Sequence, residues 1–102
     1  MTDDEFKEVQ KKVQVMGNID HHLSDLEPYL SGFMSDDQQS AQFKVIHRAA
    51  QLVDPKKAEV YNNEEKTLIE LYTLDEMREI EKHVMDATDL SIEELVSILS
   101  PS

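Results

Sequence analysis

The chain of 102 residues has no cysteine and no tryptophan, and its two glycines are Gly17 and Gly32. Without cysteine it can form neither a disulfide nor a thiolate nucleophile. Two isolated glycines cannot build the glycine-rich loop that cradles phosphates, and no Gly-x-Ser-x-Gly motif is present. The sequence therefore offers no support for nucleophilic catalysis or for nucleotide binding.

Basic residues are also scarce, with 10 Lys and Arg against 22 Asp and Glu and a net charge of −12. Nucleic acids and anionic membranes are bound through concentrated basic surfaces, so we expect neither as a direct partner. No apolar run approaches the roughly 20 residues that span a bilayer. The first five residues are acidic where a signal peptide would be basic and then apolar, so we expect a cytoplasmic protein.

The charge that is present is sorted along the chain. Residues 59–102 hold 12 acidic and 3 basic residues, a net charge of −9, whereas residues 36–58 hold 3 and 4, a net charge of +1. Residues 1–35 contribute −4, from 7 acidic and 3 basic residues. Such sorting bears on partners and solubility and does not bear on fold.

Hydrophobic residues make up 39% of the chain and recur at helical spacing, which predicts a single folded domain over residues 1–102. Five of the Ser/Thr-x-x-Glu/Gln patterns are taken as expected helix starts, because the hydroxyl and the later side chain can bond each other's backbone amides. These five begin at Thr2, Ser24, Ser35, Thr73 and Ser91.

Spacings of three and four predict a first helix whose buried stripe is Phe6, Val9, Val13 and Met16. We expect a break at Gly17-Asn18, and then a second segment with Ile19, Leu23, Leu26, Leu30 and Phe33. Pro28 either lies near the start of a helical turn or kinks a helix, and the sequence does not decide between these.

A central helix is expected from Ser35 to about Val53, with one stripe of Phe43, Ile46, Ala50 and Val53 beside a second of Val45, Ala49 and Leu52. Asp54-Pro55 ends it, and Asp54 is expected to cap a short helix over 55–61 before a turn at Asn62-Asn63. Residues 64–72 suit a helix or a strand, and helix is favoured because a partner strand is hard to find.

The C-terminal part predicts two more helices. One begins at Thr73 and buries Met77, Ile80 and Val84, and the other begins at Ser91 and ends before Pro101. The expected apolar stripe of the helix that begins at Ser91 is Ile92, Leu95, Val96, Ile98 and Leu99. The predicted fold class is all-α, a small antiparallel bundle of about four to six helices.

Metal binding is not expected, although Asp20, His21, His22 and Asp25 lie close in sequence. Adjacent histidines on a helix point about 100° apart, so His21 and His22 cannot both face one ion. Carboxylate-bridged metal bundles need Glu-x-x-His, whereas His83 follows Glu79 by four residues and Glu81 by two. We assign no catalytic, metal-binding or cofactor-binding residues and expect no cofactor.

The aromatic residues lie on or beside apolar stripes without interleaved arginine, so core packing is the favoured interpretation for them. They are Phe6, Tyr29, Phe33, Phe43, Tyr61 and Tyr72.

Part of the C-terminal acidity is expected to pair along the 74–87 helix, through Arg78–Glu81, Glu79–Lys82 and Lys82–Asp86. Seven carboxylates are then left as a candidate partner-binding surface. They are Glu59, Glu64, Glu65, Glu70, Asp89, Glu93 and Glu94. A purely solubilising face is the simpler interpretation of the same residues.

These features indicate a small acidic, non-enzymatic interaction module, an adaptor, chaperone-like or regulatory protein that binds a basic protein surface through its acidic C-terminal third. One alternative is a nucleic-acid-mimicking inhibitor of a DNA- or RNA-binding protein, since carboxylates three or four residues apart on a helix lie about 5–6 Å from each other. A remote alternative is a carboxylate-metal nucleotide hydrolase, through Glu76, Glu79, Glu93 and Glu94. The sequence leaves self-association open.

Overall fold

The computed structural model describes residues 2–33 and 38–99, and within them the chain is a bundle of helices without strands. The predicted all-α class is confirmed. The helices are α1 (Asp3–Phe33), α2 (Gln38–Val53), α3 (Pro55–Asn62), α4 (Leu68–Leu71), α5 (Leu74–Thr88) and α6 (Ile92–Leu99).

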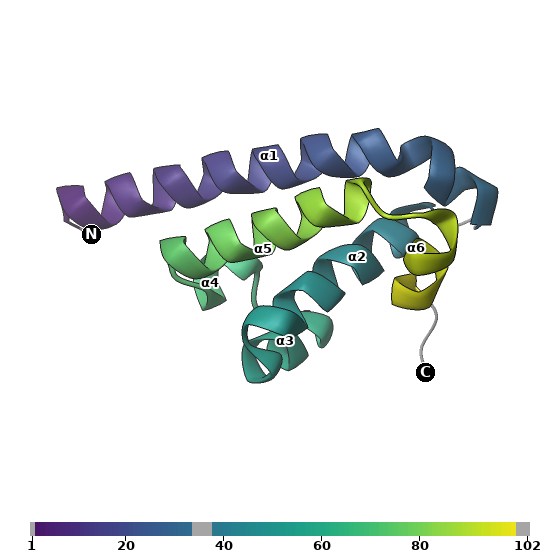
Figure 1. Ribbon diagram of the computed structural model, residues 1–102. Coiled ribbons are helices and arrows are strands. Elements are labelled where there is room, and N and C mark those ends of the chain that lie inside the picture. Colours follow the sequence, from purple (N-terminus) through teal and green to yellow (C-terminus); the bar gives the residue numbers. More distant parts are fainter. Residues whose placement is uncertain (1, 34–37, 100–102) are drawn as a thin grey trace.

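The 31 residues of α1 set the long axis of a molecule that measures 45 × 24 × 22 Å. Figure 1 shows α2 running antiparallel to both α1 and α5, so that α1 and α5 run side by side in the same direction. Figure 1 also shows the N-terminal turns of α1 extending beyond the start of α5. One end of α1 therefore has little of the bundle beside it.

The core is one cluster of buried residues from all six helices and the α4–α5 junction. The inner stripe of α1, which we define as Val15, Ile19, Leu23 and Leu26, packs with α5 and α2. The other members are Val45, Ile46, Ala49, Ala50, Ala58, Leu68, Tyr72, Met77, Ile80, Val84, Ala87 and Leu95.

Two predictions for α1 are wrong. Gly17-Asn18 does not break the helix, because the roughly 1 kcal/mol that a glycine costs is outweighed by core contacts on either side of it. The stripe predicted for the first helix is not the buried one either, since Phe6 is 53% exposed and Val13 is 52% exposed while Val15 is buried. The face of α1 that the neighbouring helices cover is rotated about the helix axis by roughly 100° from the predicted stripe.

The region around Pro28 is helical on both sides, so α1 continues through it. Ser24 does not cap a helix, because its hydroxyl donates to the backbone oxygen of Asp20 (3.2 Å) within α1. The Ser35 cap and Pro101 lie outside the described residues. So do the side chains of Leu30, Phe33, Ile92, Ile98 and Leu99.

The remaining local predictions are largely confirmed. Asp54 accepts from the amides of Lys56 and Lys57 and so begins α3, and residues 64–72 contain the short helix α4. Thr73 and Glu76 form a complete capping box at the start of α5. Among the apolar residues expected in the core, Leu52 is 56% exposed and Tyr29 is also exposed, so these two assignments are wrong.

A polar network joins α2, α3 and α5 at the α4–α5 junction. The hydroxyl of Tyr72 lies 3.1 Å from the backbone oxygen of Ala50 and 3.0 Å from that of Asp54, and it donates to them. Burial, and then the charges of Asp54 and Glu76, raise the pKa of Tyr72 to about 12. Lys57 lies 2.6 Å from Glu76 and 5.4 Å from the centre of the Tyr72 ring. Mainly because of its bond with Lys57, the pKa of Glu76 is lowered.

Candidate partner-binding site

The seven candidate carboxylates are all exposed, and they fall into two groups. Glu59, Glu64, Glu65 and Glu70 lie on α3, the α3–α4 turn and α4. Asp89, Glu93 and Glu94 lie at the opposite end of α5, around the start of α6 (Figure 1). The 15 residues of α5 correspond to about 22 Å of helix, so the seven do not share one surface.

The first group lies at the end of α3, which closes as a Schellman motif. The amide of Glu64 donates to the oxygen of Tyr61 (3.0 Å), and the amide of Glu65 donates to that of Val60 (3.3 Å). Glu64 has a φ of 60°, the left-handed region where this motif usually places glycine. A charged side chain therefore projects from a position that favours glycine, at a cost of about 1–2 kcal/mol.

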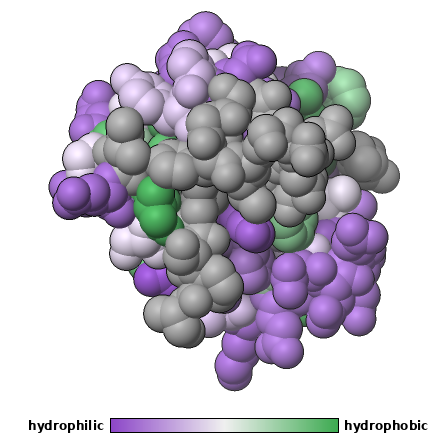
Figure 2. Space-filling model, turned by 90° about the vertical axis from the view of Figure 1, so that its right-hand side faces the viewer, coloured by the Kyte–Doolittle hydropathy of each residue, from purple (hydrophilic) through white to green (hydrophobic). Residues whose placement is uncertain are grey.

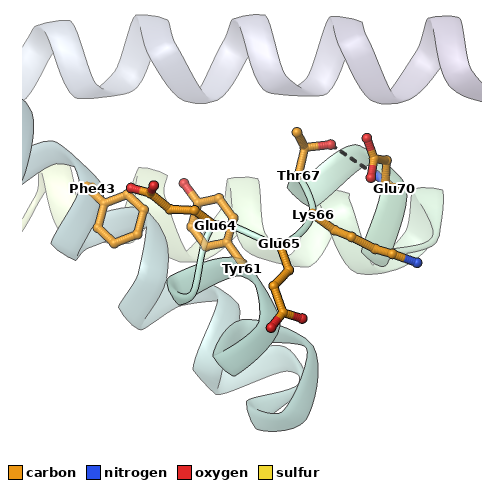
Figure 3. A pocket seen from close by; sticks show the side chains of 7 residues that line it. All are labelled: Phe43, Tyr61, Glu64, Glu65, Lys66, Thr67 and Glu70. Carbon is orange, nitrogen blue, oxygen red and sulfur yellow. Dashed lines mark hydrogen bonds between the residues drawn. The ribbon is translucent and has the colours of Figure 1, made fainter.

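Beside this turn the surface is hollowed by a pocket of about 280 Å³. We call it the hollow, and its lining residues are Phe43, Tyr61, Glu64, Glu65, Lys66, Thr67 and Glu70. Figure 3 shows the Glu64 carboxylate beside the rings of Phe43 and Tyr61, whereas the amine of Lys66 points away from them. Three of the seven candidate carboxylates thus line one pocket.

Two aromatic rings form the apolar side of the hollow. The centroids of Phe43 and Tyr61 are 5.0 Å apart with an interplanar angle of 22°, and His47 stacks on Phe43 at 6.1 Å. Both Phe43 and Tyr61 are half-buried. The sequence interpretation of these rings as core residues missed the part of each that faces the hollow.

The electrostatic surroundings of the hollow are negative. Burial, and then the charge of Asp20 on α1, raise the pKa of Tyr61. Thr67 caps α4 by accepting from the amide of Glu70 (3.4 Å), and Figure 3 shows the Glu70 carboxylate pointing toward α1. A cation in the hollow would meet aromatic faces on one side and carboxylates on the other, which is a favourable environment for an ammonium or guanidinium group.

The second group surrounds the junction between α5 and α6. Asp89 caps the C-terminus of α5, and Ser91 accepts from the amide of Glu94 (3.3 Å) at the start of α6. Seen from this end of the molecule, the described residues are largely hydrophilic with small hydrophobic areas between them (Figure 2). Glu93 and Glu94 lie in the first turn of α6, where the helix dipole stabilises negative charge, and this accounts for their position without a partner.

The three ion pairs expected on α5 do not form. In the described part of the chain the ion pairs are Lys57–Glu76 and Lys12–Glu8, and Glu81 accepts instead from the side-chain amide of Asn18 (3.0 Å). Fewer carboxylates of α5 are therefore neutralised by ion pairs than the sequence predicts.

The rings of His21 and His22 meet edge to face at 6.1 Å, and His21 is exposed. Within residues 2–33 and 38–99, no three His, Asp or Glu side chains are grouped as a metal ion requires. Over the same ranges, no helix is long and apolar enough to cross a membrane.

Comparison of the chain with protein-family models, with curated proteins and with solved structures gave no match.

Proposed function

We propose that this protein is a non-enzymatic interaction module that binds a basic surface of a protein partner, and that the hollow receives a cationic side chain of that partner. The observation that carries the proposal is that the rings of Phe43 and Tyr61, with Glu64 beside them, line a pocket of about 280 Å³ whose lining also includes Glu65 and Glu70 (Figure 3). That volume lies just below the range of about 300–1,000 Å³ for small-molecule sites, and it suits one long side chain.

The charge of the chain supports the same partner class. With a net charge of −12, the protein attracts basic proteins at long range and repels acidic ones. The hollow adds a point of recognition that a uniformly acidic surface lacks, because an aromatic face distinguishes a guanidinium or ammonium group from a neutral side chain.

The expected contribution of the hollow alone is modest. A cation over an exposed ring is worth about 0.5–1 kcal/mol, and an exposed ion pair is worth about 0–1 kcal/mol. A stable complex therefore needs contacts beyond the hollow.

The two groups of carboxylates provide a matched test. Glu64→Gln with Glu70→Gln removes two charges at the hollow, and Glu93→Gln with Glu94→Gln removes two at the far end of α5. The Debye length at 0.15 M salt is about 8 Å, so charges some 20 Å away are largely screened. We expect the first double variant to weaken binding at least fivefold and the second to weaken it less than twofold.

The measurement is retention of proteins from a lysate of the source cells on wild-type and both variant proteins, between 50 and 500 mM salt. Retained proteins are then purified and titrated individually, with DNA as a competitor. A basic partner that the Glu64/Glu70 variant alone loses supports the proposal. Equal retention by all three proteins, or a partner that DNA displaces and that both variants lose equally, would overturn it.

A further inference from the structure

The stripe that the sequence assigned to the core of the first helix lies on the surface of α1. We call Phe6, Val9, Val13 and Met16 the outer stripe. Phe6 and Val13 are more than half exposed, and Val9 and Met16 are half-buried. Their spacings of three, four and three place them on one face of the helix, about a quarter-turn or more from the inner stripe.

The outer stripe leads to the hollow. Asp20 follows Met16 by four residues and so continues the same face of α1. The charge of Asp20 acts on the hydroxyl of Tyr61, which lines the hollow. Nearer the N-terminus, the amine of Lys12 donates to the backbone oxygen of Ile69 (3.2 Å), which fixes α1 beside α4. Figure 3 shows α1 running past the hollow.

Met16 of the outer stripe and Tyr61 of the hollow both pack against the same core cluster, so the apolar residues along α1 lie near the acidic and aromatic residues of the α3–α4 turn (Figure 3). From Phe6 to Asp20 the helix rises about 21 Å, which equals about four turns of a second helix laid alongside it. A long, regular helix with apolar residues at spacings of three and four presents the ridges that another helix packs against.

We propose that the outer stripe and the hollow together bind a single amphipathic basic helix of the partner protein. Its apolar face covers Val9, Val13 and Met16, and one of its Lys or Arg side chains enters the hollow between Tyr61 and Glu64. This inference rests on the proposed function and specifies the element of the partner that is recognised.

Charge complementarity selects this occupant over a second copy of the chain. The hollow and Asp20 attract a cation, whereas a second copy brings a net charge of −12 to the interface. A basic helix neutralises the hollow and covers the apolar stripe in one contact.

Val13→Ser and Leu52→Ser are a matched pair for the test. Val13 is 52% exposed on the outer stripe, and Leu52 is 56% exposed on α2, where it lines a separate pocket with Arg48, His83 and Leu90. Both substitutions remove an exposed apolar side chain, so neither is expected to affect folding, which thermal unfolding of each variant checks.

The probe is an 18-residue peptide of leucine, alanine and arginine, in which the leucines recur at spacings of three and four and the arginines flank them. Its control is a permuted peptide of the same composition without an apolar face. In calorimetric titrations of the full chain at 50 mM salt, we expect the amphipathic peptide to bind at least tenfold more tightly than the permuted one. Val13→Ser is expected to weaken it at least fivefold and Leu52→Ser less than twofold.

Equal affinity for the two peptides, or equal losses in the two variants, would overturn the helix proposal and leave the basic-partner proposal intact. No binding of either peptide at 1 mM would count against both. Sedimentation of the free protein completes the test, because a dimer that Val13→Ser dissociates would make a second copy the occupant and contradict the proposal.

Discussion

Within α1, two apolar stripes with nearly the same spacing have opposite surroundings. The inner stripe is covered by α2 and α5, and Ile19 at its centre has no exposed surface. The outer stripe lies along the same helix, yet Phe6 and Val13 are more than half exposed. Periodicity shows that a face is apolar, and the placement of the other helices decides whether that face is covered within the chain.

The difference assigns different roles to the two stripes. Burial of the inner stripe contributes about 1.5–3 kcal/mol for each large apolar side chain, so it stabilises the fold. Phe6 and Val13 of the outer stripe contribute little of this in the free protein, although Met16 packs against the core, and in our proposal the partner helix covers the exposed part of the stripe. Substitutions on the inner stripe should therefore change stability, and those on the outer stripe should change binding.

The largest expected effect is that of Ile19→Asp. An unpaired carboxylate at this fully buried position costs on the order of 4 kcal/mol or more, a large part of the 5–15 kcal/mol that stabilises a typical domain. Val13→Asp, on the outer stripe, should change the free energy of unfolding by less than about 0.5 kcal/mol. Urea unfolding followed by circular dichroism measures both. A cooperative, stable Ile19→Asp protein would show that the inner stripe is not the core.

The two tyrosines with raised pKa values extend the comparison to polar groups. Tyr72 is buried and its hydroxyl donates to two backbone oxygens, whereas the Tyr61 hydroxyl has no hydrogen bond within the described residues. Tyr72→Phe should therefore cost about 0.5–1.5 kcal/mol, because it removes a buried hydrogen bond while the oxygens of Ala50 and Asp54 keep the backbone amides of Asp54 and Ala58 as donors. Tyr61→Phe should leave stability nearly unchanged.

The pH dependence of the free energy of unfolding should also show the contribution of Tyr72. In the unfolded chain its pKa is 10.0, and in the folded chain it is about 12, so between these values the unfolded state binds fewer protons. Its contribution to stability is complete below pH 10 and is lost as the pH rises to about 12. Urea titrations from pH 9 to 12 should show this loss in the wild type and a smaller loss in Tyr72→Phe. Identical pH profiles would rule out this role of Tyr72.

The smallest effect is expected at the α3–α4 turn. Glu64→Gly relieves the left-handed backbone and should leave stability unchanged or raise it by up to about 1 kcal/mol. Glu65 has no left-handed backbone to relieve, so Glu65→Gly only adds freedom to the unfolded chain and should lower stability by about 0.4–1 kcal/mol. Thermal unfolding of the two variants compares them. If Glu64→Gly is the less stable of the two, the left-handed position of Glu64 carries no cost.

Features that depend on neighbouring residues could be predicted from the sequence. The Thr73–Glu76 capping box and the Asp54 cap follow from side chains three or fewer residues from the amides they bond. The continuity of α1 through Gly17 could not, because the core contacts that stabilise the helix there come from α2 and α5.

The candidate site shows the same limit. The acidity of Glu64 and Glu70 is evident from composition, but the hollow requires Phe43 from α2 and Tyr61 from α3 to meet, and the charge of Asp20 on α1 helps to raise the pKa of Tyr61. The sequence interpretation grouped Glu64 with Glu93, which α5 keeps apart. The sequence shows where the charged residues lie along the chain, but it does not show which of them come together in space.

The central claim is that the outer stripe and the hollow act as one surface for a basic helix. It is tested most directly by amide chemical shifts of the full-length protein titrated with the amphipathic arginine peptide. The account predicts that shifts concentrate at residues 9–20 and 61–70 and that residues 48–52 and 89–94 change little. Shifts confined to residues 89–94, or spread evenly over all acidic residues, would contradict it.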